Sequence, residues 1–185
     1  RLIPDLENGT VSIDAELCGS GDFTAEAYYG AKLVGTATKK NKSVTAQLEL
    51  SLSEVHPWEL GNGRLYDLIL RFGQDEVKSY FGLRSIELKD GKFYLNGKSV
   101  FQRLVLDQGY YPDGITTAPT EEALIRDIQC GLTAGFNGTR MHQKVFEPRF
   151  LYHCDKLGYI VWGEHGNWGL DLSKPTCWAG FLPEW

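Results

Sequence analysis

The sequence lacks several features that would assign it to a class at once. No apolar run approaches the roughly 20 residues that a membrane-spanning helix needs, so no membrane partner is expected. The 19 Lys and Arg are outnumbered by 24 Asp and Glu, and the net charge of −5 argues against nucleic acid as a partner. The chain begins with Arg1 and has no secretory signal, so we expect a trimmed, longer protein whose localisation stays unknown.

Cysteine patterns are equally sparse. The four cysteines are scattered without a CxxC pair, which argues against a disulfide framework and favours two or more buried thiols. A metal held by Cys130, Cys154 and a histidine is an alternative, but this spacing matches no zinc pattern. We therefore expect no metal site and no cofactor.

Residues 1–83 carry short two-residue repeats of apolar and polar side chains, the pattern of half-buried strands. The repeats cover residues 11–17, 23–27, 44–50 and 66–72, and turn-forming residues separate them at 19–22, 39–42 and 61–63. This spacing predicts an antiparallel β-sandwich without a catalytic grouping. Over residues 84–103, Asp90-Gly91 and Asn96-Gly97 are tight-turn pairs that predict a small β-meander bridge.

From residue 104 the pattern changes to alternating strands and helices. Residues 104–106 form an apolar run that predicts a strand buried on both faces. Thr120 is a good N-cap for a helix that ends near Gly135, and Pro148 begins a second helix that Gly158 ends. Strands are expected at 136–140 and 159–162, so the segment predicts a parallel sheet with helical crossovers.

Each of these three strands is followed by polar or aromatic side chains, which parallel strands bring to one edge. The residues that we expect to contact a ligand there are Asp107, Gln108, Arg140, His142, Glu164 and Trp168. Carboxylate, guanidinium and imidazole groups at one mouth can hydrogen-bond sugar hydroxyls. The alternative for Arg140 and Glu164 is that they pair with each other and close the strand ends.

Four other side chains in residues 104–185 also receive an expectation, among them His153 in the predicted second helix. We expect His153 at the surface or as a helix cap, and Trp162 packed in the core. Asn167 belongs to the cluster that follows the third strand, and Trp178 is a second stacking candidate.

Three stretches of the chain carry a family resemblance: SYFGLRSIELKDGKFYLNGKSVFQRLVLDQGYYPDG at 79–114, GFNGTRMH at 135–142 and LGYIVWGE at 157–164. Together they resemble glycoside hydrolase family 2, the family of many β-galactosidases, β-glucuronidases and β-mannosidases. The resemblance implies an all-β immunoglobulin-like sandwich followed by the first three βα units of a TIM (β/α)8 barrel. The domains implied are the sandwich at 1–83, the bridge at 84–103 and a partial barrel at 104–185.

The resemblance also implies a retaining exo-β-glycosidase with a carbohydrate substrate. In this family the two catalytic glutamates follow the fourth and seventh barrel strands, so we expect no catalytic residue in this chain and no activity from it alone. The family pattern makes Arg140 a support for those carboxylates, His142 a substrate contact, and Glu164 a metal ligand or a pocket wall. At the first strand, LVLDQG departs from the G-V-N-x-H of many β-galactosidases, which indicates a different sugar or linkage.

Two other function classes stay open. The chain could be a non-catalytic module that binds a carbohydrate or a protein, or a metal-dependent enzyme that uses His142, Glu164 and His165. A three-stranded parallel sheet also has open edges. We therefore expect residues 104–185 to form a homo-oligomer, to be unusually mobile, or to be part of something larger.

Overall fold

The computed structural model describes residues 1–166, 168–179 and 181–184. The chain divides into two compact units, residues 1–101 and residues 102–185. None of the helices in the described part is both long and apolar enough to span a membrane.

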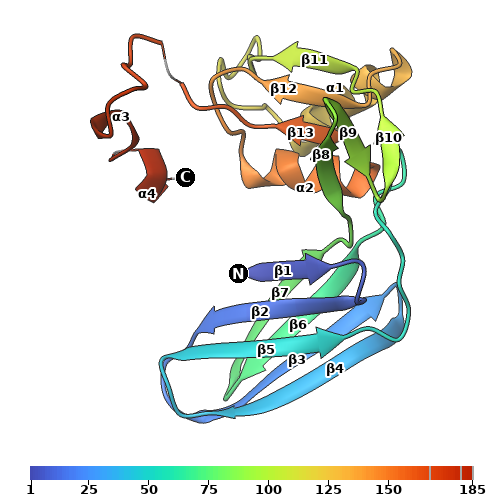
Figure 1. The fold of residues 1–185 in the computed structure, drawn as a ribbon, viewed down its shortest axis with the longest axis vertical. Coiled ribbons are helices and arrows are strands. Elements are labelled where there is room, and N and C mark those ends of the chain that lie inside the picture. The colour runs from blue at the N-terminus through green and yellow to red at the C-terminus, as the bar shows by residue number, and fades with distance from the viewer. Residues whose placement is uncertain (167, 180, 185) are drawn as a thin grey trace. The chain divides into compact units, whose positions relative to one another are not determined.

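The first unit begins with seven strands in two antiparallel sheets (Figure 1). The strands are β1 (Leu2–Asp5), β2 (Thr10–Glu16), β3 (Gly21–Tyr29), β4 (Lys32–Asn41), β5 (Thr45–Ser51), β6 (Tyr66–Phe72) and β7 (Asp75–Phe81). One sheet has the order β1-β2-β5 and the other has the order β4-β3-β6-β7. Apolar side chains from both sheets form one core, which includes Val11, Phe23, Leu50 and Leu68. The antiparallel sandwich predicted from the two-residue repeats is confirmed.

The expected turn at residues 39–42 is wrong, because β4 continues through it to Asn41. Phe23 pairs with Lys39 and Gly21 with Asn41, so the ladder to β3 covers the lysine run. β4 lies at the edge of its sheet, where exposed lysines commonly discourage pairing with another chain. The lysines therefore mark an edge strand instead of a turn.

A three-stranded antiparallel sheet completes the first unit, where the sequence predicts a meander. Its strands are β8 (Ile86–Lys89), β9 (Lys92–Leu95) and β10 (Lys98–Val100). Both predicted turns are present, with positive φ at Asp90 (51°) and Gly91 (69°), and at Asn96 (49°) and Gly97 (74°). The Asn96 side chain also accepts a hydrogen bond from the Ser85 N–H (3.0 Å) and donates one to the Trp58 carbonyl (2.9 Å). Asn96 therefore fixes the meander to the loop that precedes β6.

The second unit has the predicted alternation of strands and helices. Its elements are β11 (Leu104–Asp107), α1 (Glu121–Thr133), β12 (Gly138–Met141), α2 (Pro148–Leu157), β13 (Ile160–Trp162), α3 (Thr176–Ala179) and α4 (Phe181–Glu184). The strands are parallel in the order β11-β12-β13. Thr120 caps α1 by accepting from the Ala123 N–H (3.3 Å), and Gly158 ends α2 in the left-handed conformation (φ 72°). These helix boundaries were predictable because each depends on local sequence.

Only one face of the parallel sheet is covered by α1 and α2 (Figure 1). Residues of both helices pack against Met141 and Tyr159, in a core that includes Leu124, Ile128, Phe150 and Cys154. The opposite face carries the row Leu106, Arg140 and Trp162, which pair in register. Leu106 is 51% exposed and Trp162 is 45% exposed. The expectations that residues 104–106 are buried on both faces and that Trp162 packs in the core are therefore wrong for the described structure.

His153 is buried, and its predicted surface position is wrong. Its Nε2 lies 2.8 Å from Glu121 Oε1, so it joins α2 to the first turn of α1. The cysteine expectation also fails, because only Cys154 is buried, whereas Cys18 and Cys130 are exposed and Cys177 is intermediate.

Tyr66 is fully buried at the start of β6, and its hydroxyl group satisfies two backbone groups. It donates to the Glu54 carbonyl (3.0 Å) and accepts from the His56 N–H (2.6 Å). We expect Tyr66→Phe to lower the free energy of unfolding by about 1–3 kcal/mol, because both backbone groups lose a buried partner. Tyr94→Phe is the control, since its hydroxyl group has no hydrogen bond in the described structure. Equal shifts of the two urea midpoints would contradict this explanation.

Gly138 permits the close approach of the three parallel strands. A Cβ there would lie 2.5 Å from the Ile160 carbonyl oxygen and 2.6 Å from Leu104 Cδ2. Gly138→Ala should therefore destabilise the second unit by about 1–3 kcal/mol through overpacking. Gly21→Ala is the matched control, because its Cβ would meet only the Phe72 ring at 3.6 Å. Thermal unfolding should separate the two variants, and an unchanged midpoint in Gly138→Ala would refute the crowding argument.

Candidate functional site

Arg140 and Glu164 form an ion pair at the C-terminal ends of β12 and β13. Arg140 Nε donates to Glu164 Oε1, and a second guanidinium nitrogen lies 3.2 Å from Oε2. Two parallel hydrogen bonds of this kind fix the relative orientation of the two planar groups. About half of the Arg140 side chain stays exposed, so the pair can still meet a ligand.

The Glu164 carboxylate also accepts a third hydrogen bond, from the Gln143 N–H (3.1 Å). Gln143 has a φ of +58°, and the Glu164 N–H donates to the Lys144 carbonyl (3.2 Å). Glu164 therefore holds the turn after β12 against the end of β13. The Arg140 hydrogen bonds, and then the Gln143 N–H, lower the pKa of Glu164 below its ordinary value. Such a carboxylate accepts hydrogen bonds but is a poor proton donor near neutral pH.

His142 and Gln108 lie beside this pair and contact each other. Gln108 Nε2 is 2.8 Å from the ring nitrogen Nδ1 of His142. The backbone N–H of His142 donates to the Asp107 carbonyl (2.8 Å). His142 directly precedes Gln143, whose N–H donates to the Glu164 carboxylate, so the backbone connects the two contacts. The structure thus brings together four of the six predicted ligand residues.

Asp107 does not join them. It pairs in register with Met141, whose side chain belongs to the helix-facing core, so Asp107 lies on the face opposite Arg140. Its carboxylate accepts from the Gly109 N–H (2.7 Å), and burial raises its pKa. The negative charge of Asp127 on α1 raises that pKa further. The Asp107 carboxyl group therefore lies on the side of the sheet that α1 covers.

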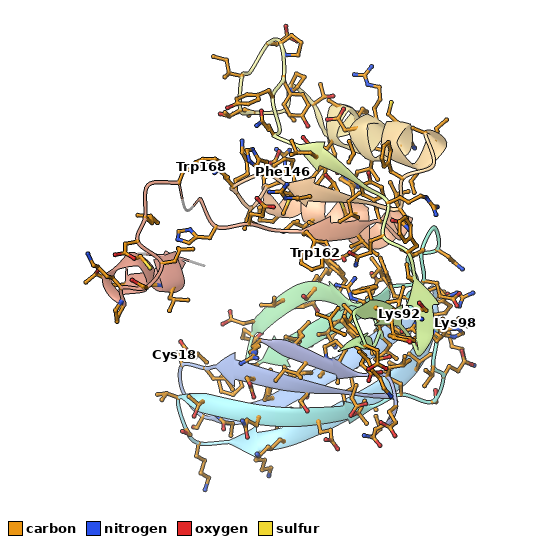
Figure 2. The ribbon with its side chains drawn as sticks, turned by 45° about the horizontal axis from the view of Figure 1, so that its top comes forward. Cys18, Lys92, Lys98, Phe146, Trp162 and Trp168 are labelled. Carbon is orange, nitrogen blue, oxygen red and sulfur yellow. The ribbon has the colours of Figure 1, made fainter. Side chains whose placement is uncertain are left out.

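Trp168 lies on the segment after β13 (Figure 2), and in the described structure it has no hydrogen bond or ring contact with the four clustered residues. It is 80% exposed. Asn167 lies outside the described residues, as does the side chain of Trp178.

Lys144 was missed by the sequence analysis although it lies two residues after His142. Its ammonium group donates to the Gln108 carbonyl and lies 4.9 Å from the centre of the Tyr110 ring. These contacts join the loop after β11 to the loop after β12. The only signal in the sequence is a lysine close to His142, which has no specificity by itself.

In the described part of the chain, no cluster of three or more His, Cys, Asp or Glu side chains is arranged to hold a metal ion. The Glu164 carboxylate already accepts three hydrogen bonds, which occupy most of its roughly four lone-pair positions. The arrangement therefore provides hydrogen-bond donors and one anchored carboxylate for a polar ligand.

Comparison with known proteins identifies the family. The model of "Glycosyl hydrolases family 2" matches residues 1–84. A β-galactosidase from Streptococcus thermophilus is 29% identical over 194 aligned positions, which cover 96% of this chain. A putative β-glucuronidase from Formosa agariphila is 27% identical over 169 positions, which cover 88% of it. The chain belongs to glycosyl hydrolases family 2.

The fold of this chain resembles that of a solved β-glucuronidase. β-Glucuronidase 3 from Bacteroides uniformis superposes with a TM-score of 0.76 at 23% identity, over 90% of this chain and 22% of that protein. The chain likewise spans about a fifth of the two curated relatives, 19% of each. The likeness in sequence continues from the sandwich into the segment that contains the Arg140–Glu164 pair.

The lowered pKa of Glu164 makes a testable contribution to the pH dependence of stability. A carboxyl group with a depressed folded-state pKa stabilises the fold above its unfolded pKa of about 4.3, and this stabilisation is lost as the pH falls through the folded value. The difference in unfolding free energy between the natural chain and Glu164→Gln should thus be larger at pH 7 than below pH 4.

Urea unfolding at a series of pH values measures that difference. Glu87→Gln is the control, because Glu87 is exposed on β8 and has no ion-pair partner in the described structure. A difference for Glu164→Gln that does not change with pH would contradict the depressed pKa.

Proposed function

We propose that this chain is an internal section of a retaining exo-β-glycosidase. Its residues 104–185 would begin a (β/α)8 barrel that follows a sandwich at 1–83 and a bridge at 84–103. Three parallel strands with helical connections support the barrel assignment, as do the relatives named as β-galactosidase and β-glucuronidase. In barrels of this type the ligand binds at the C-terminal strand ends.

We further propose that the sandwich is immunoglobulin-like. Its three- and four-stranded antiparallel sheets, β1-β2-β5 and β4-β3-β6-β7, fit that class. Tyr66 supports the assignment, because a buried tyrosine near the start of the sixth strand that bonds to upstream backbone is a hallmark of such domains. This domain would act as a scaffold for the barrel.

The observation that carries the proposed site is the doubly hydrogen-bonded Arg140–Glu164 pair beside His142 and Gln108. These four residues would form one wall of a sugar pocket, in which Arg140 and His142 contact the hydroxyl groups. Trp168 would supply a stacking surface. Asp107 would act indirectly, by holding the backbone of the loop that carries Gln108.

The two catalytic carboxyl groups would lie outside these 185 residues. A retaining enzyme needs two carboxyl groups about 5–5.5 Å apart across the scissile bond. At this sheet edge, Glu164 is engaged by three donors and Asp107 lies on the other face, so they do not form such a pair. The substrate would be a β-galactoside, β-glucuronide or β-mannoside, and the LVLDQG strand favours a different sugar or linkage from that of many β-galactosidases.

The alternative function, a carbohydrate- or protein-binding module, receives less support. The large exposed apolar side chains of the sandwich are aliphatic, at Ile3, Leu33, Val44, Val55 and Val77. Sugar-binding surfaces use aromatic platforms, and no strongly exposed aromatic side chain lies within residues 1–81, all of which are described.

An assay with 4-nitrophenyl β-galactoside and β-glucuronide tests the absence of the catalytic pair. The purified 185-residue chain should release no nitrophenol above buffer, while an authentic β-galactosidase in parallel validates the assay. Turnover that copurifies with the chain and disappears in Glu164→Gln would overturn the proposal, because it would place a catalytic carboxyl group within these residues.

A further inference from the structure

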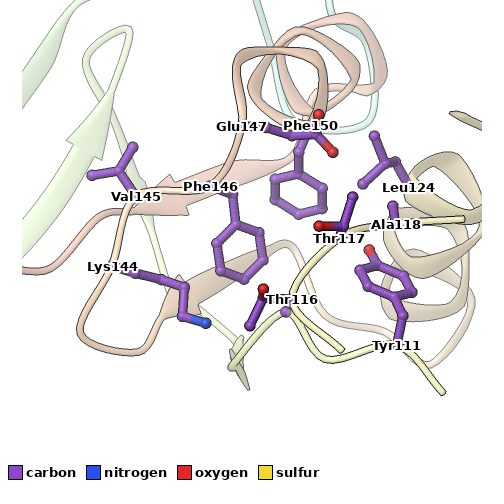
Figure 3. Close-up of a pocket in the computed structure, with 11 residues that line it drawn as sticks. Tyr111, Thr116, Thr117, Ala118, Leu124, Lys144, Val145, Phe146, Glu147 and Phe150 are labelled. Atoms are coloured by element: carbon purple, nitrogen blue, oxygen red, sulfur yellow. The ribbon is translucent and has the colours of Figure 1, made fainter. Parts of the chain in front are cut away.

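A pocket of about 250 Å³ lies between the loop after β11 and the loop after β12 (Figure 3). Tyr111, Thr116 and Thr117 line it from the first loop, and Lys144 and Phe146 line it from the second. Phe150, at the start of α2, contributes its ring. This volume lies just below the roughly 300–1,000 Å³ of sites for drug-sized ligands, so the pocket suits a single ring.

The lining combines aromatic surfaces with the hydroxyl groups of two threonines. The rings of Phe146 and Phe150 meet at an angle of 56°, with their centres 4.9 Å apart, and Tyr111 lies across the pocket (Figure 3). The hydroxyl groups of Thr116 and Thr117 form no hydrogen bond with any described residue. Apolar walls with a few convergent polar groups are typical of ligand sites.

The two charges at this pocket are already engaged. The Lys144 ammonium group donates to the Gln108 carbonyl, and Glu147 accepts from Arg149 at 2.7 and 3.0 Å. These two charges are of opposite sign, so together they give the lining no net charge that would select an ionic ligand. The pocket therefore favours an uncharged ring that carries hydroxyl groups.

The first loop, which follows β11, has residues with unfavourable or glycine-dependent backbone conformations beside this pocket. A Cβ at Gly109 would lie 2.8 Å from Phe146 Cζ, so glycine allows the Phe146 ring to pack there. Ile115 has a φ of +58°, which is rare for a β-branched residue and costs free energy. The Tyr111 and Ile115 backbones hydrogen-bond to each other at 2.8 and 3.0 Å and hold this turn. Such strain clusters at ligand sites.

Lys144 connects the pocket to the candidate sugar wall. Its carbonyl accepts from the Glu164 N–H (3.2 Å), while its side chain lines the pocket. We propose that the pocket binds one neutral pyranose ring, as a second sugar site beside the Arg140–Glu164 pair. This inference rests on the proposed function, because it assumes a carbohydrate ligand with more than one ring or a second sugar molecule.

Amide NMR of the ¹⁵N-labelled 185-residue chain, titrated with methyl β-galactopyranoside, tests the inference. Saturable shifts are expected at Tyr111, Thr117 and Phe146. Thr117→Val keeps the shape of the side chain and removes one hydroxyl group, so it should weaken this binding about three- to tenfold. Thr36→Val is the matched control on the exposed β4 strand and should leave the affinity unchanged.

Three results would overturn the pocket proposal. They are the absence of saturable shifts at the pocket residues, an affinity unchanged in Thr117→Val, and shifts produced by phenol but not by the glycoside. Signals of Arg140, His142 and Glu164 report the proposed sugar wall separately. Shifts there without shifts in the pocket would refute the second site and leave the proposed function standing. Shifts in the pocket without shifts there would support the second site and contradict the assignment of Arg140, His142 and Glu164 as a sugar wall.

Discussion

The Glu164 carboxylate is the group on which the ordered edge of the parallel sheet depends. The carboxylate accepts hydrogen bonds from Arg140 on β12 and from the Gln143 N–H in the turn that follows. The backbone N–H of Glu164 donates to the Lys144 carbonyl. One side chain after β13 thus positions the complete turn after β12. That turn carries His142 toward Gln108 and Phe146 toward the pocket, so both candidate sugar sites depend on it.

The parallel sheet separates two kinds of chemistry by its faces. Leu106, Arg140 and Trp162 share the face that α1 and α2 leave open, whereas Asp107 and Met141 share the helix-facing side. The open face places a guanidinium group between two exposed apolar side chains, a combination that suits a ligand with both apolar and polar surfaces. The covered face holds the half-buried carboxyl group of Asp107, whose pKa is raised by burial. This group accepts a hydrogen bond from the Gly109 N–H and so stabilises the loop that begins at Gln108.

Features set by local sequence were predictable, and features set by distant pairing were not. The turns at Asn96 and Asp90 and the helix end at Gly158 depend on adjacent residues, so the sequence alone predicts them. The burial of His153 depends on Glu121, 32 residues away, and the length of β4 depends on its ladder with β3. At the site, the sequence pattern predicted six ligand residues at one edge of the parallel sheet. Only the register between β11 and β12 shows that Asp107 lies on the opposite face from Arg140.

Glu164 is thus a fixed carboxylate that anchors the candidate binding wall and is a poor proton donor near neutral pH. A ¹³C NMR titration of the Glu164 side-chain carboxyl group tests this most directly, with Arg140→Lys as the perturbing variant. We expect a Glu164 pKa below the ordinary value of about 4.3, and a pKa in Arg140→Lys that is closer to that value. A pKa at or above the ordinary value in the natural chain would refute this role of Glu164.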